Sequence, residues 1–466
     1  MLYDIVIRNG TLVTAAETAK ADLAIADGRI AAIGCALGRG REEIDATGLF
    51  VLPGGVDAHC HVDEPPFLGA RLADGFESAT RSAACGGTTT IVPFVNQLPG
   101  ATLREAVEDY RRKASPAIID YALHVILTSV SPQLLGQDVP ALMADGLRSY
   151  KVFMTYPGFM LDDAAILEVM ACVREGNGTV MVHAENGHCV HWLANRFESR
   201  GETELAAFAA AAPVAVEREA CHRAITLAEL TGARLLLVHI SSVDAMDQIG
   251  WARARGLRVL AETCPQYLLA GMSAEEHGQT GWEGAKFVCA PPPRGSGEAE
   301  KLWARVALGA FQLLSSDHCP YCFEEMDGKR VRGGQQPHFR HVPPGLPGLE
   351  TRLPLLFEEG VAKGRIGLSQ FVALTATQPA QTYGLYPRKG SLMPGADADV
   401  ALWECNRSRA IRHAELHDAC DYSPYEGRVV SAWPIMTFSR GELVWNNGQL
   451  PASPGRGQFV TQGPHP

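Results

Sequence analysis

The feature that most constrains the fold is a regular alternation of short apolar runs with longer helix-like stretches between residues 53 and 390. Most of the runs are apolar throughout, as strands buried on both faces are. Eight of them read as strands, and they are 55–58, 88–95, 119–127, 149–154, 179–183, 234–240, 259–263 and 311–317. Eight parallel strands with helices between them, over this length, predict an α/β fold of the (β/α)8 barrel type with insertions.

Both ends of the chain have a different texture, with short apolar segments separated by tight turns. Asn9-Gly10 and Asp27-Gly28 suit two-residue hairpin turns, which require positive φ, and Arg440-Gly441 separates two strand candidates near the C-terminus. We therefore expect one smaller β-sandwich domain built from both termini. The expected limits are 1–52 with 391–455 for the sandwich, 53–390 for the barrel, and 456–466 for a C-terminal tail that wraps loosely over the surface.

The composition narrows the class of protein. Lys and Arg total 41 against 52 for Asp and Glu, a formal net charge of −11, so no cationic excess is available to displace counterions from a nucleic acid. No apolar run approaches the roughly 20 residues that span a bilayer, and the N-terminus lacks the basic and apolar regions of an export signal. We expect a cytoplasmic protein with neither a nucleic-acid nor a membrane partner.

The twelve cysteines are scattered and do not resemble a disulfide framework. The one Cys-x-x-Cys spacing lies at Cys319 and Cys322, after the eighth predicted strand, whereas a redox pair of this kind belongs near the start of a thioredoxin-like unit. Two unpaired loop thiols are the better interpretation.

Four histidines and an aspartate stand at the ends of predicted barrel strands. His59 and His61 follow the first run, and residues two apart in a strand share a face, so both imidazoles can reach one ion. His183 and His239 each close an apolar run, and Asp317 closes the eighth. Singly, His183 and His239 are each explained equally well by a core side chain bonded to a carbonyl, and an isolated His-x-His pair is a weak metal signal. Together they indicate one metal site, because barrel active sites lie at the C-terminal ends of the strands.

Lys151, in the fourth run, is the odd member of this set. An ammonium cannot ligate a metal and is repelled by neighbouring cations. A lysine paired with a loop carboxylate is one interpretation. The alternative is carbamylation by CO2, which converts the amine into an anionic carbamate able to bridge two metals, and the residues alone leave the two open.

Many motifs, in order along nearly the whole chain, resemble those of the cyclic amidohydrolases of the amidohydrolase superfamily, most closely the dihydropyrimidinase and hydantoinase group. The first is Pro-Gly-Gly-Val-Asp-Ala-His-Cys-His at 53–61, and the others lie at 86–90, 151–156, 182–185, 238–242, 262–268, 317–320, 345–350 and 421–427. So many motifs in the right order are far more specific than any one alone.

The resemblance implies a barrel with a β-sandwich formed by both termini, a homodimer or homotetramer, and a pair of divalent metal ions, usually Zn²⁺. The residues that would hold the ions are His59, His61 and Asp317 for the more buried one, His183 and His239 for the more exposed one, and Lys151, as N6-carboxylysine, between them. This role for Lys151 comes from the resemblance alone.

The resemblance also implies the chemistry. A hydroxide bridging the ions would attack the carbonyl carbon of a cyclic amide, and Asp317 would take up its proton and return it to the leaving ring nitrogen. Tyr156 matches a tyrosine that donates to the developing oxyanion in hydantoinases and dihydropyrimidinases. The expected substrate is a dihydropyrimidine or a 5-substituted hydantoin, which opens to an N-carbamoyl amino acid.

Two positions in the expected substrate loops depart from the hydantoinase pattern. Ala290 stands where those enzymes have serine, in a loop that holds the ring through its backbone. Pro344 stands where they have asparagine, and proline has no N–H to donate. The Cys-Ala-Pro-Pro segment at 289–292 and Asp63-Glu64-Pro65 favour allantoinases, whereas Asp63 cannot replace the arginine by which dihydroorotases hold a carboxylate.

Two alternatives to a hydantoinase or dihydropyrimidinase therefore stay open. One is another cyclic-amide hydrolase, an allantoinase or a cyclic imidase. The remote one is a non-catalytic, dihydropyrimidinase-like scaffold protein, which the intact set of six candidate ligands disfavours.

Overall fold

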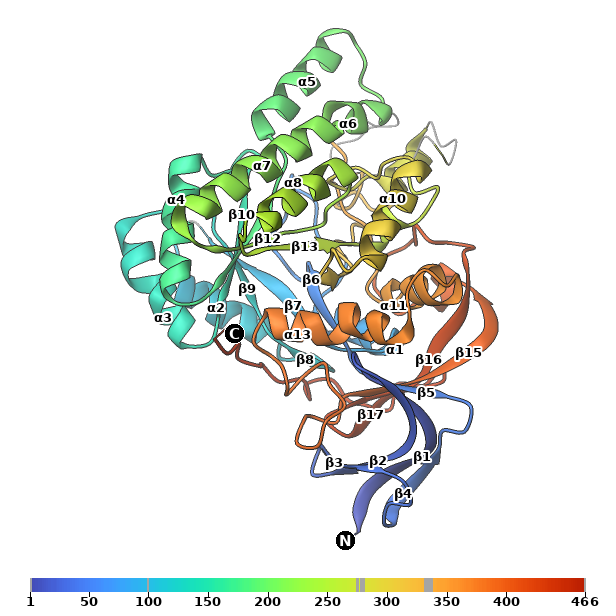
Figure 1. Cartoon of the computed structure of the whole chain (residues 1–466). Coiled ribbons are helices and arrows are strands. Elements are labelled where there is room, and N and C mark those ends of the chain that lie inside the picture. The colour runs from blue at the N-terminus through green and yellow to red at the C-terminus, as the bar shows by residue number, and fades with distance from the viewer. Residues whose placement is uncertain (1, 99, 274–275, 277–280, 331–337, 465–466) are drawn as a thin grey trace.

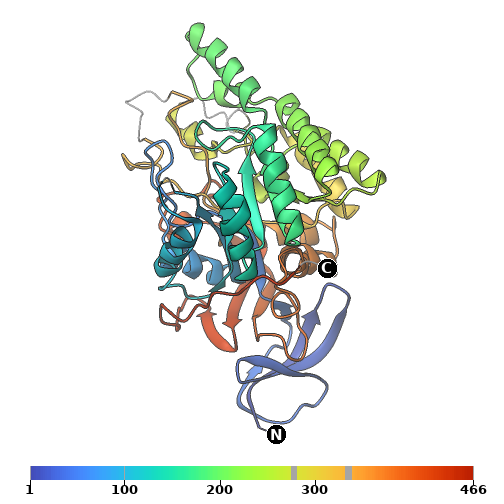
Figure 2. The same cartoon turned by 90° about the vertical axis from the view of Figure 1, so that its left-hand side faces the viewer.

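The computed structural model describes residues 2–98, 100–273, 276, 281–330 and 338–464. A β/α barrel occupies the middle of the molecule, and strands from both termini form a separate sheet at one end (Figure 1). Helices α5 (Gly187–Ser199) and α6 (Ala206–Ala211) project at the opposite end, and the view turned by 90° shows the same separation (Figure 2). Among the described residues, no helix combines the length and apolar character needed to span a membrane.

The barrel wall confirms all eight predicted strand positions. In spatial order the path is β14-β13-β12-β11-β10-β9-β7-β6, with parallel pairing throughout, and the third predicted run is divided between β8 and β9, which both pair with β7. A parallel bridge between Cys60 and His318 joins the two ends of this path. The strands are β6 (Gly55–Cys60), β7 (Thr88–Asn96), β8 (Asp120–Tyr121), β9 (His124–Ile126), β10 (Ser149–Phe153), β11 (Thr179–His183), β12 (Arg234–Leu237), β13 (Val259–Thr263) and β14 (Leu313–Leu314).

Helices follow the strands and cover the outside of the barrel, as in a β/α repeat. Two π-helical segments extend the helices near the end of the barrel. Phe357–Ala362 continues α11, and Ala373–Thr377 joins α12 to α13. The remaining helices are α1 (Phe76–Cys85), α2 (Leu103–Lys113), α3 (Val139–Ala144), α4 (Asp163–Glu175), α7 (Val214–Thr231), α8 (Val243–Ala254), α9 (Pro265–Leu268), α10 (Ser296–Ala307), α11 (Arg352–Leu356), α12 (Leu368–Val372) and α13 (Gln378–Thr382).

The alternation of side chains along the strands separates the barrel interior from the layer under the helices. In β11, Val180 and Val182 belong to the large core beneath the helices, whereas Met181 belongs to the interior cluster. In β10, Tyr150 and Val152 face the helices in the same way. Residues of the opposite parity, which include the sequence-predicted site residues of these strands, therefore face the interior.

The terminal strands form one eight-stranded mixed sheet, which confirms a β unit built from both ends of the chain. Its path is β17-β16-β15-β5-β1-β2-β3, with β4 also paired to β1. The strands are β1 (Tyr3–Val13), β2 (Thr18–Ala26), β3 (Arg29–Gly34), β4 (Gly40–Asp45), β5 (Phe50–Pro53), β15 (Val400–Ala410), β16 (Val429–Ser439) and β17 (Glu442–Asn446).

The turn predictions in this sheet are confirmed at two places and wrong at one. Asp27-Gly28 and Arg440-Gly441 join neighbouring antiparallel strands with positive φ at both positions. Asn9-Gly10 instead lies inside β1, where Asn9 (φ 60°) marks a bulge in the pairing with β2. The physical reason is that an Asn-Gly pair supplies positive φ for a bulge as readily as for a turn, and a Cβ at Gly10 would lie 2.6 Å from Val51.

The C-terminal tail is held more firmly than the predicted loose wrapping. The Tyr121 N–H donates to the Gln458 carbonyl (3.0 Å), and the Val460 N–H donates back to the Tyr121 carbonyl (2.7 Å). Buried Gln462 accepts the Arg148 N–H through its side chain (2.6 Å). The tail thus satisfies the hydrogen-bonding capacity of backbone groups at the amino ends of barrel strands. The Gly and Pro content of the tail, from which loose wrapping was predicted, does not reveal these contacts.

Candidate metal centre

The first barrel strand places two histidines side by side at the barrel mouth. The pairing of β6 with β7 shifts register between Asp57 and Cys60, and His59 is completely buried, while the His61 side chain retains a little exposure. Across the closing seam, the Asp317 N–H donates to the His59 carbonyl (2.9 Å). Asp317 has φ 50°, a costly conformation for a residue other than glycine that is concentrated at functional sites.

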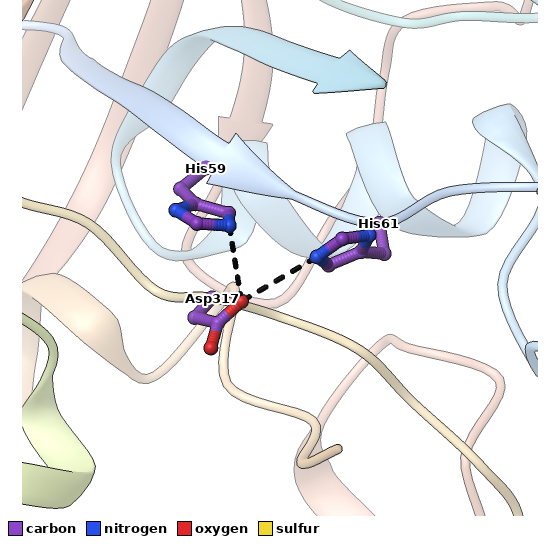
Figure 3. A group of neighbouring side chains, drawn as sticks. All are labelled: His59, His61 and Asp317. Carbon is purple, nitrogen blue, oxygen red and sulfur yellow. Dashed lines mark ion pairs between the residues drawn. The ribbon is translucent and has the colours of Figure 1, made fainter. Parts of the chain in front are cut away.

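These three side chains converge on one point (Figure 3). Asp317 Oδ1 lies 3.3 Å from His59 Nε2 and 3.5 Å from His61 Nε2. Their ligand atoms all fall within 4.8 Å of one another. Two imidazole nitrogens and a carboxylate oxygen at this spacing form a donor set suited to a divalent transition metal.

Lys151 reaches the same point from β10. Its Nζ lies 2.8 Å from His59 Nε2 and 4.4 Å from the centre of the Phe94 ring. The side chain is 1% exposed, and no carboxylate lies within ion-pair distance of Nζ in the described part of the chain. The interpretation as a lysine paired with a loop carboxylate is therefore wrong, because the closest group is an imidazole.

His183 and His239 form the other side of the centre. Their ring centroids are 4.5 Å apart, and the His239 ring is 5.5 Å from that of His59. His239 lies two residues beyond β12, with φ 39°, rather than within the strand as predicted. Its buried Nδ1 has no hydrogen-bond partner among the described residues. The six residues predicted as ligands are thus gathered at one end of the barrel.

Three glutamates that the sequence reasoning passed over orient these imidazoles. Glu262 contacts His59 Nδ1 (2.8 Å), Glu64 contacts His61 Nδ1 (2.7 Å), and Glu185 contacts His183 Nε2 (2.7 Å). A carboxylate behind a histidine fixes the ring and raises its basicity toward a metal. The available signal was their place inside the motifs, since Glu64 and Glu185 each follow a candidate histidine by two or three residues.

Burial dominates the electrostatics of the centre. Burial, followed by the charge of Lys151, holds the pKa of His59 well below its ordinary value. Burial also lowers the pKa of Lys151, against the attraction of Asp317 and Glu262. Although burial opposes it, the neighbouring His59 and His61 lower the pKa of Asp317, which is therefore a carboxylate at neutral pH. The centre offers anionic and neutral donors together.

A cavity of about 130 Å³ opens over the centre. Tyr156 lines it with φ 69°, and its ring packs edge-on against His183 with centroids 5.2 Å apart. Burial raises the pKa of the Tyr156 phenol well above its ordinary value, so the hydroxyl keeps its proton. The side chains of Phe67 and Phe159 form an apolar wall beside it.

The two positions that depart from the hydantoinase pattern also line this cavity. Ala290 and Pro344 are both partly exposed in it. Neither residue makes a hydrogen bond within the described part of the chain. Cys319 lines the cavity too. Cys319 and Cys322 are both free thiols, as predicted.

A (β/α)8 barrel that gathers histidines, an aspartate and a buried lysine beneath one cavity at the carboxyl ends of its strands has the architecture and donor set of a metal-dependent hydrolase.

Comparison with known proteins agrees with this class. Residues 50–444 match the Amidohydrolase family. The D-hydantoinase of Rhizobium radiobacter is 41% identical over 458 residues, which are 98% of each chain, and that of Geobacillus stearothermophilus is 41% identical over 457 residues, 97% of this chain and 95% of the relative. The crystal structure of dihydropyrimidinase from Brevibacillus agri NCHU1002 superposes with a TM-score of 0.94 at 38% identity, covering 99% of both chains. The chain belongs to the amidohydrolase family, in its hydantoinase and dihydropyrimidinase group.

Proposed function

We propose that the protein hydrolyses a cyclic amide, a 5-substituted hydantoin or a dihydropyrimidine, to the N-carbamoyl amino acid. The observation that carries this proposal is that His59 and His61 converge on Asp317, with the Lys151 amine beside His59, at a cavity that Tyr156 also lines. The relatives' names, D-hydantoinase and dihydropyrimidinase, supply the substrate class.

The side chains present fit a pair of divalent ions, with zinc as the proposed metal. The unpartnered Nδ1 of His239 and the amine of Lys151 facing an imidazole are buried groups that lack good partners in the protein alone. The proposed ligands are His59, His61, Asp317, His183 and His239, together with Lys151 as N6-carboxylysine. The Lys151 amine would attack the carbon of CO2, form an N–C bond and lose a proton, which replaces a cation by an anion. When bound, such ions lower the pKa of a water and polarise a carbonyl.

Asp317 is the proposed general base and acid. Its carboxylate lies at the cavity floor, where it can take a proton from the attacking water and return it to the ring nitrogen as the amide C–N bond breaks. The strained backbone at this residue (φ 50°) fixes the direction of the carboxylate.

Tyr156 is the proposed oxyanion donor. A phenol that keeps its proton can donate to the carbonyl oxygen of the ring as negative charge develops there, which is worth roughly 3–4 kcal/mol in comparable sites. The carbonyl groups of Ala290 and Pro344 would accept the N–H groups of the ring. Since Pro344 offers no N–H itself, the contact at this position is limited to accepting a hydrogen bond.

A substrate panel tests this proposal. The zinc-loaded protein is given dihydrouracil, 5-substituted hydantoins, allantoin and succinimide, and ring opening is followed by loss of the cyclic amide. Turnover of hydantoin or dihydrouracil is expected to dominate. Preference for allantoin or succinimide would replace the substrate by that of an allantoinase or a cyclic imidase, and turnover of none would leave the scaffold alternative.

We further propose the domain limits given above, a homodimer or homotetramer, and a cytoplasmic location. The sheet formed by the termini supports the division into domains. The acidic composition supports the location, and the oligomeric state is proposed from the family resemblance alone. Size-exclusion chromatography with light scattering tests the oligomeric state.

A further inference from the structure

A second fully buried lysine lies beside the substrate cavity, outside the metal centre. Lys329 is 0% exposed, and its Nζ donates to three backbone carbonyls, those of Val288 (3.0 Å), Pro343 (3.0 Å) and Gly345 (2.8 Å). No carboxylate pairs with it in the described ranges of the chain. An ammonium is the side-chain group that presents three donors to carbonyls converging on one point.

Local backbone contacts hold Lys329 in this position. Its own N–H donates to the Cys322 carbonyl (2.8 Å), which closes the loop that follows β14. The preceding Gly328 packs so tightly that a Cβ would lie 2.1 Å from the same carbonyl oxygen. The backbone of the closed loop thus fixes the position from which the Lys329 side chain reaches the three carbonyls.

The three carbonyls belong to the two segments that form the substrate side of the cavity. Cys289 and Ala290 follow Val288, and Pro344 lies between the other two bonded residues; all three line the cavity, as does Gly345. The Gly345 N–H also donates to the Val288 carbonyl (2.9 Å). Lys329 therefore ties together the backbone on both sides of the positions proposed to hold the ring.

We infer that Lys329 is a positioning residue for recognition of the cyclic amide: it fixes the Ala290 and Pro344 carbonyls at the spacing of the ring's N–H groups. This inference rests on the proposed function. Burying an ammonium without a carboxylate is costly, so the three carbonyls of these two segments have to stay converged on Lys329 to compensate for its burial.

The same arrangement makes substrate affinity depend on pH. Burial lowers the pKa of Lys329 to about 8. The titratable groups that face it are the thiols of Cys289, Cys319 and Cys420, and burial raises the pKa of each, so they stay neutral in this range. A neutral amine has two N–H groups for three carbonyls. One carbonyl then loses its donor, and KM is expected to rise as the pH passes about 8.

Steady-state kinetics of the zinc-loaded enzyme test this role, with the best substrate of the panel. Lys329→Met removes the three donors at similar volume and is expected to raise KM roughly tenfold. Its kcat should stay within about threefold, because the metal ligands are untouched. The KM of the wild type should rise above pH 8, whereas that of the variant should be high and flat. Lys363→Met, at an exposed lysine paired with Glu359, is the matched control.

Hydrogen exchange measured by mass spectrometry keeps the inference independent of activity. Faster exchange of the amides at 288–290 and 345–346 in Lys329→Met, with the barrel strands unchanged, is expected. Unchanged exchange, or a KM that equals that of the wild type at every pH, overturns the inference. If the wild type opens no ring, the proposed function fails, and the exchange comparison still decides whether Lys329 holds the two segments. The pH profile of the wild type needs no variant and covers the case in which Lys329→Met does not fold.

Discussion

Two buried lysines at opposite ends of the barrel are 1% exposed, yet their surroundings differ completely. At the base, Lys389 Nζ lies 2.6 Å from Asp120, 3.0 Å from Asp397 and 2.8 Å from Asp399. At the mouth, the nearest group to Lys151 Nζ is the imidazole of His59.

The difference shows how partners decide what a buried amine can do. Although burial opposes it, Asp399 and Asp120 raise the pKa of Lys389 above its ordinary value, so it is a permanent ammonium. Lys389 links barrel strand β8 to the segment leading into β15, and Arg440 adds a second cation to Asp120 (3.1 Å). The base therefore uses charge for cohesion between the two sheets, whereas the mouth leaves Lys151 with no carboxylate in ion-pair contact among the described residues and with a pKa that burial lowers.

The same substitution made at both lysines gives the largest expected contrast. Lys151→Met should lower kcat/KM by roughly a thousandfold or more, because it removes the proposed N6-carboxylysine ligand, and the ions that this ligand would help to hold would activate the attacking water. Bound zinc, measured by mass spectrometry of the metal content, should fall in parallel. A variant with full zinc and full activity would remove Lys151 from the centre. Native mass spectrometry of the wild type should show the added mass of one CO2, absent in the variant.

Lys389→Met is expected to do the reverse. Removing one member of a buried ion cluster leaves charges unpaired and costs roughly 3–5 kcal/mol of unfolding free energy. Activity per folded molecule should be unchanged. Because the folded pKa of Lys389 lies above the ordinary 10.5, its stabilisation is fully present below that value and is lost only as the pH rises through the folded pKa. The deficit in urea unfolding should therefore persist between pH 6 and 9. Equal stability of variant and wild type would show that the cluster contributes no net cohesion.

The sequence predicts the mouth better than the base. Strand runs such as 179–183 end in a polar residue, and the carboxyl ends of parallel strands must meet, so His183 and Asp317 could be placed together from periodicity alone. The Lys389 cluster carries no such signal. The partners of Lys389 lie in two segments, at Asp120 and at Asp397 and Asp399, and they meet only because the terminal sheet docks under the barrel.

Contacts that depend on closure of the whole fold were likewise beyond prediction. Glu262 contacts His59 although the two residues are 203 positions apart, and no local sequence pattern predicts that they meet. The bulge at Asn9 depends on which strand β1 pairs with, because Asn-Gly suits a bulge and a turn equally. The proposed bridging role of Lys151 came from the family resemblance, and the structure adds the location of its amine beside His59.

Tyr156→Phe probes the mouth without touching a proposed metal ligand. Loss of the phenol donor should lower kcat by roughly a hundredfold or more, with KM, zinc content and melting temperature nearly unchanged. The phenylalanine keeps the ring that packs against His183, so a fall in stability would point to a packing role instead. An unchanged kcat would assign the oxyanion to another donor.

Glu262→Gln should have the smallest effect and refines the comparison further. Burial raises the pKa of Glu262 to about 8, yet its oxygen lies 2.8 Å from His59 Nδ1 and 3.3 Å from the His239 N–H. An amide of the same shape keeps the geometry but weakens the acceptor, and changes of this kind behind a metal-bound histidine cost roughly 10- to 100-fold in metal affinity. Zinc competition with a chelator should show this loss, and excess zinc should restore activity. If activity stays low at saturating zinc, Glu262 acts on the reaction itself. Catalysis at the barrel mouth would then depend on a buried acid as directly as cohesion at the barrel base depends on Asp120.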